Sequence, residues 1–106
     1  MTTTALDNNY LDLLRTEVVS DLADAVQTLT DLADKSKEDR AEGLRLKAAA
    51  VQDVIDQHTE RLVSVQTVED VAAILGIITT DANHAQTVQE REGYLLASQY
   101  VSRLVY

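Results

Sequence analysis

The chain has 106 residues, a length typical of one domain, and it contains neither cysteine nor proline. Without cysteine there is no disulfide framework and no thiolate chemistry, and without proline the strongest helix breaker is missing. The net charge of −9 repels nucleic acid and anionic membranes, so we expect neither as a direct ligand and allow a basic protein partner. With no visible signal peptide or membrane span, we expect one cytoplasmic domain over residues 1–106, of which residues 1–6 are a frayed start.

An apolar stripe follows this start and predicts a first helix of about 25 residues. Asp7, Asn8 or Asn9 can cap the helix, because a short polar side chain accepts hydrogen bonds from the free N–H groups of the first turn. The stripe is formed by Leu11, Leu14, Val18, Leu22, Ala25, Leu29 and Leu32.

The segment from Asp34 to Lys37 breaks the apolar pattern and predicts a turn. Ser36 and Asp39 have the spacing of a capping box, which would start the second helix. That helix has an expected length of roughly 28 residues. Its stripe contains Leu44, Ala48, Val51, Ile55, His58 and Leu62. Two long helices joined by a short turn predict an antiparallel hairpin.

A third helix is predicted after Thr67, which can cap it. The helix contains the run Val71 to Ile78, V-A-A-I-L-G-I-I, which is apolar or small on nearly every side. A helix with this pattern is usually buried, so we expect it to be the central element against which other helices or a second copy pack. Ala72 and Gly76 are small and four residues apart, and would allow another helix to come close.

The pattern changes between Gln86 and Gly93, where Val88 is the only apolar residue. We favour a break or bend in this segment, with Gly93 as a stop signal and a shorter fourth helix after it. The alternative is one continuous third helix of about 38 residues. The predicted fold is therefore all-α, an antiparallel bundle of three long helices plus a shorter C-terminal one, or of three helices with a very long third.

The C-terminal segment carries three of the four tyrosines among aliphatic residues. Tyrosine is frequent at interfaces because it combines a large apolar area with a polar tip. We therefore expect a non-catalytic interaction module of helical-bundle or coiled-coil type that self-associates, with a dimer favoured. The alternative is that this segment docks onto its own bundle. The predicted interface consists of Ala72, Gly76, Ile77, Tyr94, Leu95, Tyr100, Val101, Leu104 and Tyr106.

The first helix supports a second hypothesis, because residues 1–34 carry seven acidic residues and one basic residue. Such a face suits an acidic inhibitor or nucleic-acid mimic that occupies a basic groove on a partner protein. The residues that would form this face are Asp12, Glu17, Asp24, Asp31 and Asp34.

A small metal protein or enzyme is the third hypothesis, and its candidates are His58, His84 and Asp81. Asp81 and His84 are three residues apart and share one helix face, but a carboxylate metal site in a bundle needs further Glu and His units. No phosphate-binding glycine loop or zinc spacing is present. We assign no catalytic, cofactor-binding or metal-binding residue.

Overall fold

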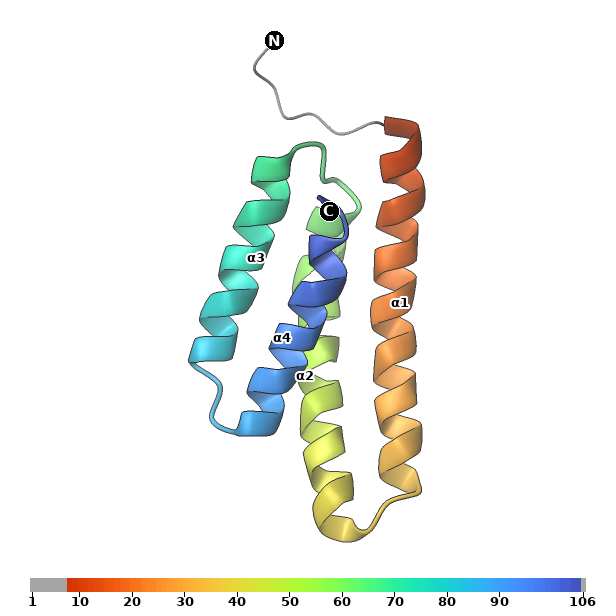
Figure 1. Cartoon of the computed structure of the whole chain (residues 1–106), viewed down its shortest axis with the longest axis vertical. Helices are drawn as coiled ribbons and strands as arrows, with labels where there is room; N and C mark the ends of the chain where they lie inside the picture. The colour runs from red at the N-terminus through yellow and green to blue at the C-terminus, as the bar shows by residue number, and fades with distance from the viewer. Residues whose placement is uncertain (1–7, 106) are drawn as a thin grey trace.

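The structure, a computed structural model, describes the backbone of residues 8–105 and the side chains of residues 12–105. It contains four helices: α1 (Asn8–Asp34), α2 (Glu38–Leu62), α3 (Val68–Asn83) and α4 (Val88–Ser102). They form an antiparallel all-α bundle (Figure 1). The predicted fold class is thus confirmed, in its four-helix form. The expected frayed start, the Asp7 cap and Tyr106 lie outside the described residues.

The bundle is built from two hairpins of unequal length. Helices α1 and α2 have 27 and 25 residues, whereas α3 and α4 have 16 and 15. At 1.5 Å per residue the first hairpin is about 15 Å longer than the second. Figure 1 shows the shorter hairpin against the upper part of the longer one, so that the α1–α2 turn projects beyond α3 and α4.

The stripe of α1 is buried as predicted at Val18, Leu22, Ala25 and Leu29, and it ends on Ala33, while Leu32 is exposed. The predicted capping box at the start of α2 is wrong. The residue before α2 is Lys37, which makes no side-chain cap, and the Ser36 hydroxyl donates back to the Leu32 carbonyl at 2.6 Å. Ser36 therefore satisfies the end of α1 and is not free to start α2.

Helix α2 is the centre of the bundle, because it packs against α1 on one side and α4 on another. Its buried side is formed by Ala41, Ala48, Ala50, Val51, Val54, His58 and Leu62, and Ile55 is only half-buried. The predicted central helix was α3, and that prediction is wrong. Helix α3 lies at the edge, packs mainly on α4, and buries one stripe, which consists of Val71, Ile74, Ile78 and Ala82.

The cap predicted at Thr67 is confirmed, and it is a complete capping box. The Thr67 hydroxyl accepts a hydrogen bond from the Asp70 N–H at 3.1 Å, and the Asp70 carboxylate accepts from the Thr67 N–H at 3.1 Å. The same carboxylate accepts from the Gln66 N–H at 2.9 Å. These N–H donors, with that of Gln66 first, hold the pKa of Asp70 below its ordinary value.

The break between the last two helices is confirmed, so the single long helix is excluded. Helix α3 ends at Asn83, and the Thr87 hydroxyl caps α4 by accepting from the Glu90 N–H at 3.1 Å. The prediction of Gly93 as a stop signal is wrong, because Gly93 is buried in the interior of α4. Thr87 begins the new helix, and Gly93 serves the packing of α4 on α2.

Candidate functional site

The outer face of α3 is the first candidate for an interaction surface. The predicted interface residues Ala72, Gly76 and Ile77 all lie there and are exposed, next to Ala73 and Thr80. No charged residue occurs from Val71 to Thr80. A Cβ atom built on Gly76 would meet no other atom within 4 Å, so the surface there is open. Most of the apolar residues on this face are small and expose little area to water, and Ile77, at 36% exposed, is the large one among them.

The C-terminal cluster packs largely into its own bundle. Val101 and Leu104 are 0% and 2% exposed, so these two predicted interface residues belong to the core and cannot form an interaction surface. Tyr94 and Tyr100 are half-buried against the core, and only Leu95, at 44% exposed, stands on the surface. Among the described residues, the docking alternative therefore fits most of the segment.

Tyr94 also makes a polar contact across the bundle. Its phenolic hydroxyl donates to the Asp53 carboxylate of α2 at 2.7 Å. Burial raises the pKa of Tyr94 well above its ordinary value, and the Asp53 carboxylate raises it further. This contact makes Tyr94 a residue that joins α2 to α4.

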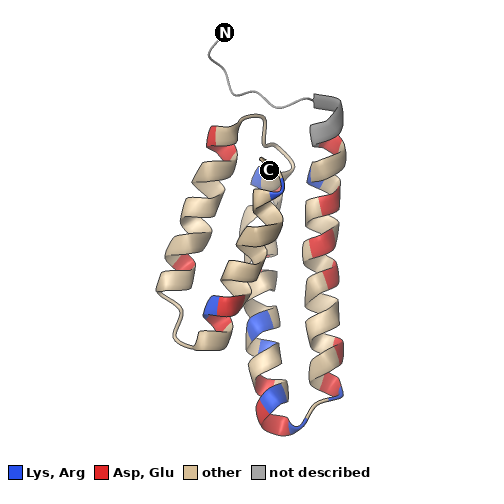
Figure 2. Ribbon diagram, in the orientation of Figure 1, with Lys and Arg blue, Asp and Glu red and all other residues tan. Residues whose placement is uncertain are grey.

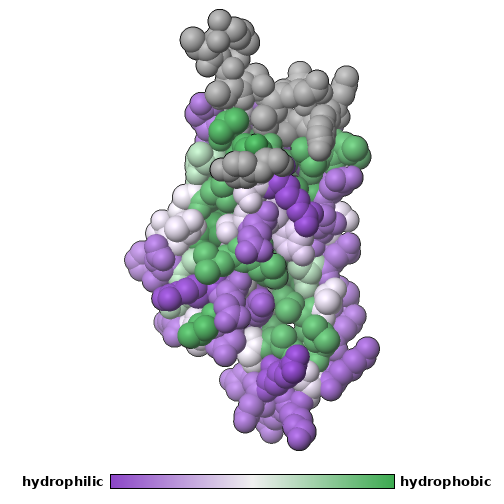
Figure 3. All heavy atoms as spheres, in the orientation of Figure 1, coloured by the Kyte–Doolittle hydropathy of each residue, from purple (hydrophilic) through white to green (hydrophobic). Residues whose placement is uncertain are grey.

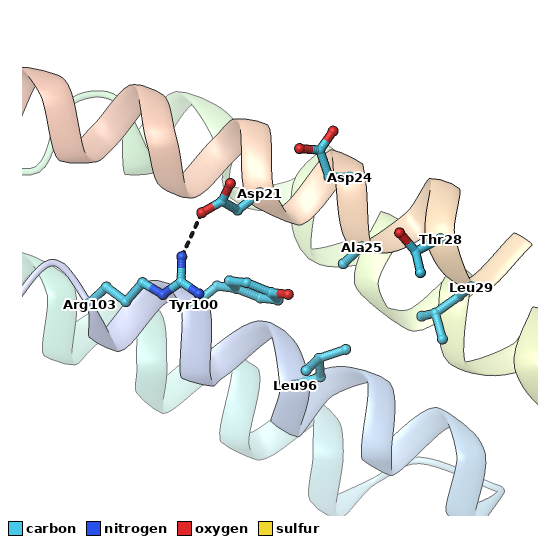
Figure 4. Close-up of a pocket in the computed structure, with 8 residues that line it drawn as sticks. All are labelled: Asp21, Asp24, Ala25, Thr28, Leu29, Leu96, Tyr100 and Arg103. Atoms are coloured by element: carbon cyan, nitrogen blue, oxygen red, sulfur yellow. Dashed lines mark hydrogen bonds and ion pairs between the residues drawn. The ribbon is translucent and has the colours of Figure 1, made fainter. Parts of the chain in front are cut away.

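A groove between α1 and α4 is the second candidate surface, and the sequence reasoning missed it. It has a volume of about 410 Å³. Figure 4 shows Leu96 of α4 pointing toward α1 and the Tyr100 ring lying along the groove. The lining residues are Asp21, Asp24, Ala25, Thr28, Leu29, Leu96, Tyr100 and Arg103. Leu96, Tyr100 and Arg103 are spaced so that they lie along one side of a helix, and this spacing could have indicated the groove from the sequence.

One end of this groove is closed by Arg103. Its guanidinium group donates to the Asp21 carboxylate at 2.5 Å and lies 4.5 Å from the centre of the Tyr100 ring. Asp24, one turn farther along α1, has no partner among the described residues. On the α1 side of the groove, Asp21 therefore pairs with Arg103, whereas the Asp24 carboxylate is available to a base from outside.

The acidic residues of α1 are the third candidate surface, and Figure 2 shows them as a line of red segments along the helix. Two of its members pair with neighbouring bases: Asp12 with Arg15 at 2.9 Å, and Asp34 with Arg45 of α2 at 3.5 Å. The pair of Asp34 and Arg45 is exposed on both sides, and an exposed pair contributes about 0–1 kcal/mol. All five residues, Asp12, Glu17, Asp24, Asp31 and Asp34, are exposed.

The two histidines lie in different surroundings. His58 is 2% exposed, and its Nδ1 atom has no hydrogen-bond partner. Burial lowers the pKa of His58, as does Arg61, and these effects outweigh those of Asp81 and Asp53. His84 is exposed at the end of α3, with Nδ1 2.8 Å from the Thr80 carbonyl oxygen.

Metal-ligating side chains are not grouped in the part of the chain whose side chains are described. No three His, Asp or Glu residues there lie close enough together to hold a metal ion. His58, His84 and Asp81 therefore do not form a ligand cluster. Within residues 8–105, no helix is both long and apolar enough to cross a bilayer.

Comparison of the chain with protein-family models, with curated proteins and with solved structures finds no match.

Proposed function

We propose that this protein is a non-catalytic helical interaction module that forms a homodimer through the outer face of α3. The observation that supports this is the exposed and uncharged surface around Ala72 and Gly76 on a protein with a net charge of −9. Small side chains let two helices approach closely, so that backbone and side-chain atoms make many van der Waals contacts.

The charge distribution favours this face over the others. Two copies that met through α1 would bring two acidic helices together, which costs electrostatic free energy. Two α3 helices paired antiparallel would keep their acidic first turns, which contain Glu69 and Asp70, at opposite ends of the contact. Antiparallel pairing also aligns the helix dipoles favourably. A contact of one helix per copy is smaller than a standard interface, so we expect a weak dimer.

The test is the solution mass, measured by light scattering over about a hundredfold range of concentration. The wild type should shift from monomer to dimer, and Ala72→Arg should stay monomeric, because the arginines of two copies would repel each other at the contact. Ala49→Arg is the matched control, since Ala49 is exposed on α2 and the substitution adds the same charge. A monomeric wild type, or equal dimerisation of both variants, would contradict the proposal.

The acidic face of α1 supports a second candidate function, an inhibitor or nucleic-acid mimic that binds a basic protein. Its support is the exposure of five carboxylates along a single helix. Binding of this kind weakens steeply with salt, because exposed charges are screened. Titration with an octalysine peptide at low and high salt tests it. Asp24→Asn combined with Asp31→Asn should reduce the affinity, and unchanged affinity would exclude the face.

A further inference from the structure

The groove between α1 and α4 lies where two helices of the bundle are in little contact with each other. Helix α1 packs mainly against α2 and touches α4 much less, so a channel remains between α1 and α4. Ala25 and Leu29 line it from α1, and Leu96 lines it from α4. Figure 3 shows an apolar band along the α1–α4 boundary, with hydrophilic atoms on both sides. Apolar side chains of an added helix would be shielded from water in this channel.

The charge of the groove identifies the kind of helix that fits. Asp21 and Asp24 stand on its α1 side, and the only base among its lining residues is Arg103. Arg103 already shows how this rim holds a cation, because its guanidinium group pairs with Asp21 while it stacks on Tyr100. Asp24 has no such partner among the described residues. A basic side chain from outside could pair with Asp24 in the same way.

We propose that this groove binds an amphipathic, basic helix of a partner protein. Its apolar side chains would contact Ala25, Leu29 and Leu96. Its Lys or Arg residues would lie beside Asp24, because Asp21 already pairs with Arg103. From Asp21 to Leu29 the α1 wall is about 12 Å long, which matches two turns of a bound helix. Two or three apolar side chains at spacings of three and four residues fill that length. The groove is separate from the α3 face, so this proposal does not depend on dimerisation.

The probe is a synthetic peptide of about 14 residues, four helical turns, made of Leu and Lys with all Leu on one face. A peptide of the same composition in scrambled order has the same charge but no apolar face. Binding is followed by the amide chemical shifts of the full chain, carrying Ala72→Arg so that dimerisation does not contribute. We expect the amphipathic peptide to shift amides of residues 21–29 and 96–103, and to bind at least tenfold more tightly than the scrambled peptide.

Two variants with the same change of charge separate groove binding from general attraction to an acidic protein. Asp24→Lys should weaken binding about tenfold, because a partner base would meet a like charge. Glu60→Lys should leave binding unchanged, because Glu60 is exposed on α2 and is not among the groove residues.

Four outcomes of the peptide titrations would overturn the proposal. They are no binding, equal binding of the two peptides, equal weakening by the two variants, or shifts confined to α3. Concentration-dependent shifts of the groove amides without peptide would also overturn it, since the occupant would then be a second copy.

Discussion

Gly93 of α4 lies directly against the backbone of α2 at Lys47. A Cβ atom at position 93 would stand 2.7 Å from the Cβ of Ala50 and closer still to the carbonyl oxygen of Lys47. Neither neighbour can rotate away, because one is backbone and the other is the first atom of a side chain. The hydrogen atom of Gly93 therefore sets how closely α2 and α4 approach.

Gly93→Ala should lower the free energy of unfolding by about 1–3 kcal/mol, because the helices must separate to admit the methyl group. Chemical denaturation of both proteins measures the difference. Gly76→Ala is the matched control, since its Cβ would meet no other atom within 4 Å of the same copy, and both substitutions are made in the Ala72→Arg background so that dimerisation does not contribute. That control should raise the free energy of unfolding by about 0.5–1 kcal/mol, because alanine is the better helix former. Equal effects of the two substitutions would show that the close approach at Gly93 does not matter.

The contact between Tyr94 and Asp53 should make the fold sensitive to alkaline pH. The pKa of Tyr94 is raised in the folded state, so the protonated phenol is favoured there. The contribution of protonated Tyr94 to the free energy of unfolding is complete below the pKa of tyrosine in the unfolded chain, about 10. This contribution is lost as the pH rises above that value. In Tyr94→Phe, the free energy of unfolding should therefore fall less at alkaline pH than in the wild type. At neutral pH the same substitution should lower the free energy of unfolding by about 0.5–1.5 kcal/mol, because the hydrogen bond to Asp53 is missing. Thermal unfolding between neutral and alkaline pH measures both, and an unchanged alkaline loss would refute the assignment.

His58 should make the fold sensitive to mild acid. Its pKa is lowered in the folded state, so the unfolded chain binds the proton more readily. The contribution of neutral His58 is therefore complete above the ordinary pKa of about 6.5 and is lost as the pH falls below it. His58→Gln should flatten the dependence of the unfolding free energy on pH between neutral and about pH 5. His84→Gln is the control, because His84 is exposed. The prediction would be contradicted if the dependence of the unfolding free energy on pH changed in His84→Gln and stayed as in the wild type in His58→Gln.

Thr67→Ala should lower the free energy of unfolding by about 1 kcal/mol, because it removes the side-chain acceptor that starts α3. Thr79→Ala in the same helix is the comparison, since Thr79 is exposed in the helix interior. Alanine there should be neutral or slightly stabilising, because it has the higher helix propensity. Urea denaturation of the pair measures the difference, and equal stability of the two variants would show that the cap contributes nothing.

Local sequence patterns predicted most of the helices and their ends. The stripe of Leu22 and Leu29, the cap at Thr67 and the polar break before α4 are all visible in sequence, because each depends on residues within one or two turns. The interface on α3 could be named as a set of residues, and its use by a second copy stays a prediction.

Features that depend on how the helices pack could not be predicted. The run Val71 to Ile78 was expected at the centre, but whether a small residue faces a neighbour or water depends on where that neighbour lies. Gly93 has the sequence context of a helix stop, and only the crossing of α4 over Lys47 shows its role in packing. The α1–α4 groove exists because α1 touches α4 so little, which no local pattern records.

The projection of the α1–α2 hairpin beyond α3 and α4 has a consequence for hydrogen exchange. Helix α4 begins beside Gly43, whose Cβ position lies 3.2 Å from Gln89. The last turn of α1 and the first turn of α2 are therefore held mainly by each other. Amide protons there should exchange through local opening, while those around Val54 and Val101 should exchange only on global unfolding. The tip can thus fray and re-form while the rest of the bundle stays folded.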